Sequence, residues 1–148
     1  MATKRFDKEL HDIYDKMGRD IVKDFVSLNW GMEARCNPKV RGIDLLLYTR
    51  EGALAGYAEV EVRLSWKTLE FPYADLNVPE RKRKLLNQDL PTFFFSINKD
   101  GTALFHCESN VVLESKVEEV RNKHVFRDEQ FFKVPLDKLN YVILQPST

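Results

Sequence analysis

The sequence predicts an α+β or mixed α/β domain in which a central mixed β-sheet is flanked by helices. Near the N-terminus, apolar residues recur at steps of three and four, which is typical of an amphipathic helix. Apolar and polar residues then alternate over residues 54–64, which is typical of a strand with one buried face. Two later apolar segments flank a turn sequence and indicate a β-hairpin.

The composition favours a single domain over residues 1–148. With 148 residues, of which 43% are hydrophobic, the chain can bury one core but is short for two. Its 23 Lys and Arg balance its 23 Asp and Glu, so a surface for nucleic acid would need local clustering of basic residues. No apolar segment approaches the roughly 18 residues of a membrane span, and we expect no membrane contact.

Cysteine usage and the first residues favour a reducing, cytoplasmic setting. Cys36 and Cys107 lie far apart without CxxC spacing. The first ten residues contain no apolar segment of the kind that secretory signals carry. The sequence thus gives no sign of a disulfide framework or of secretion. Because disulfides are rare in the cytosol and common in secreted proteins, we expect an intracellular protein.

The N-terminal half is predicted to contain one helix and two strands. The helix covers residues 7–28, and a Leu-rich strand covers residues 40–49. A turn at residues 51–52 leads into the strand 54–64. Within that strand Glu59, Glu61 and Arg63 share one face, so we expect a charged face opposite an apolar one.

The C-terminal half is predicted to contain a short basic helix and several strands. Pro79 suits the first position of a helix, which would extend over residues 79–90. The hairpin follows, with strands at 92–97 and 102–107 joined by the turn 98–101. Beyond it we expect a short strand or helix, a polar stretch and two late strands, at residues 111–120, 122–130, 131–136 and 139–144.

Three acids lie on the two N-terminal strands: Asp44 on the first, and Glu59 and Glu61 on the second. If these strands pair, the three carboxylates can converge on one patch. Mg²⁺ or Mn²⁺ binds such oxygen ligands, lowers the pKa of a bound water and stabilises charge on a phosphate. Alternatively, the acids of the second strand belong to the solvated face of an edge strand. An acid inside the run IDLLL, however, requires a partner or a site.

This pattern resembles the PD-(D/E)XK nuclease superfamily, in which an Asp, a gap and an acid-x-Lys on the next strand hold the metal. The segments GIDLLLY, GYAEVEVR and VPERKRK look like those of small phage-encoded members. The resemblance implies a restriction-endonuclease-like core with αβββαβ order and a Mg²⁺-dependent endonuclease acting on DNA. Asp44 and Glu59 would bind metal, and Glu61 would be a ligand or the general base. A homodimer would suit cleavage of both strands.

Glu61 occupies the position that is lysine in most of that superfamily. Some restriction enzymes of the superfamily carry glutamate there and remain active. A second alignment takes Glu61 as the acid and Arg63 as the cation. Lys67, Arg81 or Lys82 could instead supply a positive charge from another position, as happens in this superfamily.

Basic and aromatic residues supply candidates for contact with DNA. A solvated helix face explains the basic residues equally well, and aromatic residues at such spacing more often pack in a core or a loop. The candidates for the phosphate backbone are Arg63, Lys67, Arg81, Lys82, Arg83 and Lys84. Aromatic residues that could stack on unpaired bases are Trp66, Phe71 and Tyr73.

Acidic residues of the N-terminal helix and the segment after it are further candidates. Asp20, Asp24 or Glu33 could be the additional acid that many superfamily members contribute from the first helix. Charged positions on an amphipathic helix are nevertheless usually exposed to solvent.

A second functional class is also consistent with the sequence. The chain could keep this fold without the chemistry and serve as a module that binds nucleic acid or a protein partner, because fold alone does not determine activity.

Overall fold

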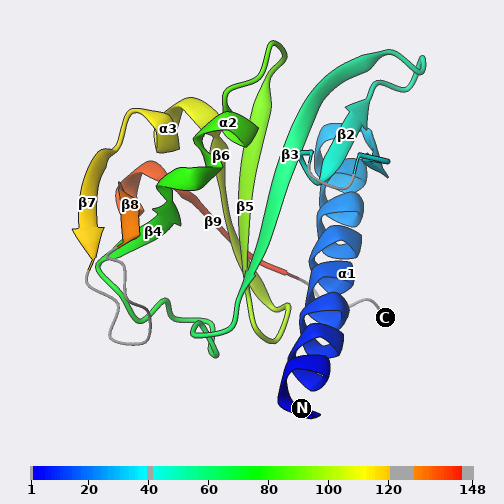
Figure 1. Cartoon of the computed structure of the whole chain (residues 1–148). Coiled ribbons are helices and arrows are strands. Elements are labelled where there is room, and N and C mark those ends of the chain that lie inside the picture. Colours follow the sequence, from blue (N-terminus) through cyan, green and yellow to red (C-terminus); the bar gives the residue numbers. More distant parts are fainter. Residues whose placement is uncertain (1, 40–41, 121–128, 145–148) are drawn as a thin grey trace.

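One long helix packs on one face of a six-stranded mixed sheet, and a three-stranded sheet packs on the other face (Figure 1). The computed structural model describes residues 2–39, 42–120 and 129–144, and side chains from residue 8 onward. In chain order the elements are α1 (Ala2–Trp30), β1 (Glu33–Cys36), β2 (Leu45–Tyr48), β3 (Leu54–Arg63), β4 (Asp75–Pro79), η1 (Glu80–Lys82), α2 (Arg83–Leu86), β5 (Thr92–Asn98), β6 (Ala103–Glu108), α3 (Ser109–Leu113), β7 (Lys116–Val120), β8 (Glu129–Pro135), η2 (Leu136–Lys138) and β9 (Asn140–Ile143).

The large sheet has the strand order β1-β2-β3-β5-β6-β9, and the small sheet has the order β4-β8-β7. In the large sheet β3 and β5 are parallel, whereas the other neighbours are antiparallel. Parallel strands need a crossover connection. Here the crossover contains β4, η1 and α2, so the chain after β3 crosses one face of the large sheet before it returns as β5.

The first hydrophobic core lies between α1 and the large sheet. Val22 and Val26 of the helix are fully buried there, together with Phe95 and Ile97 of β5. The helix approaches β3 most closely at Gly18, where an added Cβ would lie 2.8 Å from Cγ2 of Val62. The helix therefore crosses the sheet at a position where only glycine fits without displacement.

The second core lies on the opposite face of the large sheet, beneath the small sheet. Phe94 of β5 points into it, next to Phe132 of β8 and Leu76 of β4. A smaller cluster adjoins it, in which the fully buried Trp66 stacks on Phe105 with ring centroids 4.9 Å apart. Because adjacent residues of β5 serve opposite cores, that strand is buried on both faces.

The structure confirms the expected α+β class, the long N-terminal helix, the strand over residues 54–64 and the hairpin. The strand expected over 40–49 is shorter, because the side chain of Asn37 donates to the carbonyl of Ile43 and closes a loop before β2. The structure adds β1, which the sequence pattern did not predict. The segment 111–120 is both helix and strand, as α3 followed by β7.

The basic helix expected over residues 79–90 was wrong in extent. Pro79 ends strand β4, and only the short η1 and α2 follow it. The two late strands are β8 and β9, whereas most of the polar stretch 122–130 lies outside the described residues. Within the described part of the chain, no helix combines the length and the apolar character that a membrane crossing requires.

Candidate functional site

Asp44 and Glu59 lie side by side at the start of β2, where this strand begins to pair with β3. Asp44 immediately precedes β2, whose first residue pairs with Ala58 of β3. Oδ2 of Asp44 accepts a hydrogen bond from the backbone N–H of Val60 at 2.8 Å. Oε1 of Glu59 in turn accepts a longer one, 3.4 Å, from the backbone N–H of Asp44. The strand pairing therefore holds the two carboxylates together, as expected from the sequence.

Lys82 completes the group from the crossover connection. Its Nζ lies 3.1 Å from Oε2 of Glu59, and the exposed fractions of the two side chains are 18% and 6%. Lys82 ends the short helix η1, which the crossover places over the charged face of β3. Two acids and one lysine from three separate segments thus meet in a largely buried position.

Burial has a strong effect on the ionisation of Glu59. Removal from water raises the pKa of its carboxyl to about 7; the ammonium of Lys82 opposes this shift, and the carboxylate of Asp44 adds to it. A carboxyl with such a pKa is balanced between its neutral and charged forms near neutral pH. A further cation beside Glu59 would therefore favour its charged form.

A polar cavity of about 210 Å³ opens beside these residues. Its remaining walls come from Val60 and Val62 of β3 and from Asp15 and Arg19 of α1. Asp15 and Arg19 were not among the site residues expected from the sequence. The signal that could have found them is Gly18, since the helix face beside a glycine that touches the sheet also faces the site.

Glu61 and Arg63 form a separate ion pair farther along β3. Oε2 of Glu61 lies 2.6 Å from Nη2 of Arg63 and accepts a hydrogen bond from the hydroxyl of Ser96 at 2.7 Å. Arg63 also donates to the backbone carbonyl of Asn77. Both charged side chains are only 17% exposed, so this face of β3 is covered by the crossover and is not a solvated edge.

The expected convergence of three carboxylates is therefore corrected to a pair. Glu61 does not line the cavity beside Asp44 and Glu59, because its carboxylate is held by Arg63 and Ser96. Among the described residues, no group of three or more His, Cys, Asp or Glu is arranged to hold a metal ion.

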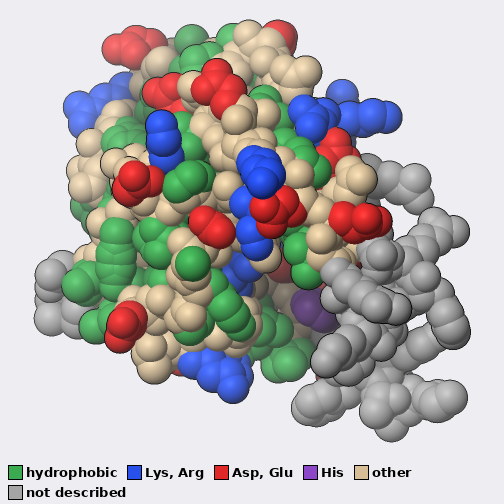
Figure 2. Space-filling model, turned by 90° about the vertical axis from the view of Figure 1, so that its left-hand side faces the viewer, with side chains coloured by type: hydrophobic (Ala, Val, Ile, Leu, Met, Phe, Trp, Pro, Cys, Tyr) green, Lys and Arg blue, Asp and Glu red, His purple; other side chains and the backbone are tan. Residues whose placement is uncertain are grey.

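Of the basic candidates, Lys82 is the one that lines the cavity. Arg81 is exposed and lies 3.6 Å from Glu129. Arg83 donates to Glu80 and lies over the ring of Phe132. Lys67 and Lys84 are exposed. On the face that carries the small sheet, basic and acidic side chains are interspersed (Figure 2).

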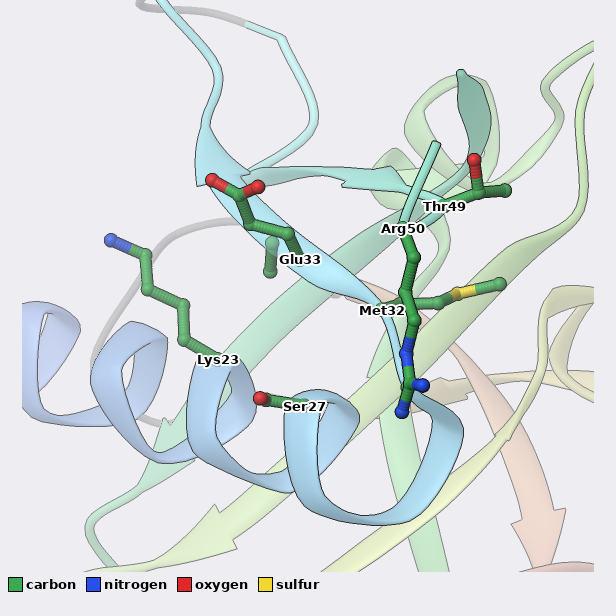
Figure 3. A pocket seen from close by; sticks show the side chains of 8 residues that line it. Lys23, Ser27, Met32, Glu33, Thr49 and Arg50 are labelled. Carbon is green, nitrogen blue, oxygen red and sulfur yellow. The ribbon is translucent and has the colours of Figure 1, made fainter. Parts of the chain in front are cut away.

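The three acids expected near the first helix do not reach the cavity. Asp20 is exposed and pairs with Lys16 at 2.7 Å, and Asp24 is exposed on the same helix. Glu33 of β1 pairs with Arg35 at 3.0 Å. Glu33 also lines a different pocket near the C-terminal end of α1, as do Lys23, Ser27 and Arg50 (Figure 3).

Asp44 and Glu59 are a suitable donor set for Mg²⁺ or Mn²⁺. Mg²⁺ in proteins is often held by one or two carboxylates and keeps several waters, which leaves positions for substrate phosphate. Lys82 already supplies one positive charge beside the buried carboxyl of Glu59, and a divalent ion would favour its charged form further. Asp15 lies close enough to line the same cavity.

Comparisons of the chain with protein-family models, with curated protein sequences and with solved structures found no match. The class of protein must therefore be inferred from the fold and from the residues that meet at Asp44. Those residues are two adjacent carboxylates and a lysine, which meet where β2 begins to pair with β3 and where η1 lies over β3.

Proposed function

We propose that this protein is a Mg²⁺- or Mn²⁺-dependent endonuclease that hydrolyses phosphodiester bonds in DNA. The observation that carries the proposal is the meeting of Asp44, Glu59 and Lys82 in one polar cavity. Hydrolysis of a phosphodiester needs a means of activating water and positive charge near the phosphate. Two metal-binding carboxylates and a lysine meet both needs.

Each residue has a defined role in this proposal. Asp44 and Glu59 hold the divalent ion, which when bound acidifies water and stabilises charge on the phosphate. In the ion-free protein, the ammonium of Lys82 balances the negative charge of the Glu59 carboxylate. With Glu59 engaged by the ion, the Lys82 ammonium becomes available to the phosphate or the attacking water. Arg19, on the opposite wall, is placed to contact a phosphate oxygen.

The order of elements supports a restriction-endonuclease-like core as part of the proposal. One helix is followed by three antiparallel strands, a short helix and a strand parallel to the third, namely α1, β1, β2, β3, α2 and β5. This order supports the αβββαβ arrangement that the sequence resemblance implies, although β4 and η1 come before α2. In this alignment Lys82 of η1 takes the place of the lysine that Glu61 replaces.

Replacement of Asp44 tests the proposal directly. We expect the wild-type chain to cleave supercoiled plasmid or single-stranded circular DNA with Mg²⁺ or Mn²⁺ and to be inactive in EDTA. Asp44→Asn should lower the rate at least a hundredfold while the chain stays folded. Asp24→Asn, an exposed acid of α1, is the matched control and should cleave at the wild-type rate. An Asp44→Asn variant as fast as the parent would contradict the assignment.

A second candidate, a binding module without hydrolytic activity, is favoured by one observation. Lys82 already neutralises Glu59, so the acid pair is partly compensated without a metal ion. Titration of Mg²⁺ and Mn²⁺ during thermal unfolding separates the two candidates. If the site binds the ion, a free ion concentration of 100 times the Kd should raise the free energy of unfolding by about 2.7 kcal/mol. No rise in the melting temperature with either ion, together with no cleavage, would favour the binding module.

A further inference from the structure

Glu59, Glu61 and Arg63 form a row of charged side chains along one face of β3. A second, larger pocket lies at the Arg63 end of this row. Its volume is about 440 Å³, which is in the range of pockets that bind small organic groups. It is built from the end of β3, the segment around β4 and the strand β8. Its lining includes Arg63, Tyr73, Asp75, Asn77, Phe131 and Lys133.

This pocket and the Asp44 cavity lie at opposite ends of the same row of side chains. Glu59 and Arg63 are four residues apart on one face of β3, a separation of roughly 13 Å. Lys82 contacts Glu59, and the carbonyl of Asn77 contacts Arg63, so the segment 77–82 runs beside the row from one pocket to the other. The two pockets therefore lie at either end of this covering segment, and about two nucleotides of extended chain passing outside it would join them.

The side chains around the second pocket combine aromatic, hydrogen-bonding and positively charged groups. Tyr73 is 51% exposed, so a ligand can reach it, and its ring packs edge-on against Phe71 with centroids 5.6 Å apart. Phe131 supplies a second aromatic wall, and Asp75 supplies a carboxylate acceptor. Lys133 adds positive charge. Unpaired bases are bound by such combinations of stacking surfaces, polar groups and basic residues.

Asn77 has an unused hydrogen-bonding group at this pocket. Its Oδ1 is buried and has no hydrogen-bond partner among the described residues, although the residue lines the pocket. A buried acceptor without a donor is costly. Because Asn77 lines the pocket, an amino group or ring N–H of a bound base is a donor that this oxygen would meet if the side chain reorients on binding.

We infer that this pocket takes an unpaired base of the DNA strand whose phosphodiester lies at Asp44 and Glu59. The inference rests on the proposed function and names its substrate class. A base that is stacked and paired in a duplex does not enter such a pocket. The substrate is therefore single-stranded DNA, or DNA with a locally unpaired base.

Binding in EDTA tests the pocket without any need for hydrolysis. Two fluorescein-labelled single strands of equal length serve as probes, one of mixed sequence and one made of abasic deoxyribose phosphate units. Fluorescence anisotropy at fixed salt should give at least about fivefold tighter binding of the base-bearing strand to the wild-type chain. Tyr73→Ala and Asn77→Leu should bring this ratio close to one. Asn110→Leu, an exposed position of α3, should retain the ratio.

Equal binding of the two probes by the wild type would overturn the inference. So would an unchanged ratio in the folded Tyr73→Ala variant, which decides the question if Asn77→Leu does not fold. Cleavage is scored separately with Mg²⁺. A preference for bases that Tyr73→Ala abolishes, with no cleavage by the wild type, would support the pocket and refute the nuclease. Cleavage of the mixed-sequence strand without any preference for bases in binding would support the nuclease and refute the pocket.

Discussion

The ammonium of Lys82 lies 3.1 Å from Oε2 of Glu59, and both side chains are largely withdrawn from water. Ion pairs of exposed residues contribute little, but a buried carboxylate depends on its partner because it has lost its hydration. The pair forms because the β3–β5 crossover brings η1 over the face of β3 that carries Glu59. One connection thus covers the acid and supplies its counter-charge.

Replacement of Lys82 should reduce cleavage far more than replacement of a neighbouring lysine. Loss of a preorganised charge next to the reacting group typically costs about a hundredfold or more in rate. We expect that loss for Lys82→Ala and a change within about twofold for Lys84→Ala, which removes an exposed charge from α2. Single-turnover cleavage at saturating enzyme measures this. Equal losses in both variants would reduce Lys82 to a general contact with the DNA backbone.

The raised pKa of Glu59 makes the stability of the metal-free protein depend on pH. Its pKa is about 7 in the folded chain against an ordinary value of 4.5, so the folded state holds this proton more tightly than the unfolded state does. Stability is therefore lost as the pH rises from about 4.5 to about 7. Glu59→Gln cannot ionise and escapes this loss.

We expect the stability of Glu59→Gln relative to wild type to improve between pH 5 and pH 8 by about 1–3 kcal/mol. Thermal unfolding in EDTA across this range measures the difference. Parallel pH profiles for the two proteins would contradict the raised pKa. Saturating Mg²⁺ should reverse the trend for the wild type alone, since the ion binds the charged carboxylate.

Sequence alone was sufficient for part of the site. An acid inside the apolar run before β2 and an acid on the alternating strand β3 predicted the pairing of Asp44 with Glu59, because neighbouring strands bring such residues together. The pairing of Glu61 with Arg63 could also be predicted from the sequence, because residues two apart share a face of a strand.

The rest of the site depends on tertiary structure. Four adjacent basic residues follow Pro79, and only the path of the crossover decides that Lys82 turns inward while Arg81 is exposed. Asp15 and Arg19 enter the cavity because α1 crosses β3 at Gly18, which no local pattern of charges reveals. The same crossover explains the wrong extent of the basic helix, since Pro79 pairs in the small sheet.

Glu61→Gln should separate a structural role for Glu61 from a role in metal binding. Glutamine leaves the charge of Arg63 without its partner, and hydrogen bonds to charged groups contribute about 1.5–3 kcal/mol. We expect a loss of that order in chemical denaturation, with the stabilisation by Mg²⁺ unchanged. A variant of normal stability that no longer responds to Mg²⁺ would instead identify Glu61 as a ligand.

The close approach of α1 to β3 at Gly18 can be tested by a single methyl group. Alanine is a better helix former than glycine by about 1 kcal/mol, so Gly18→Ala would be stabilising on an open helix face. Here the added Cβ would lie 2.8 Å from Cγ2 of Val62 and 3.1 Å from Cγ1 of Val60. Such overlap typically costs about 1–3 kcal/mol. We therefore expect a net loss of stability.

Ser27→Ala is the matched control, because it adds helix propensity at an exposed position of the same helix. Urea midpoints should fall for Gly18→Ala and stay level or rise slightly for Ser27→Ala. Cleavage should also fall in Gly18→Ala, because Val60 and Val62 line the Asp44 cavity and must move with the displaced helix. A Gly18→Ala protein that is more stable than its parent and equally active would show that the helix and β3 do not touch at this position.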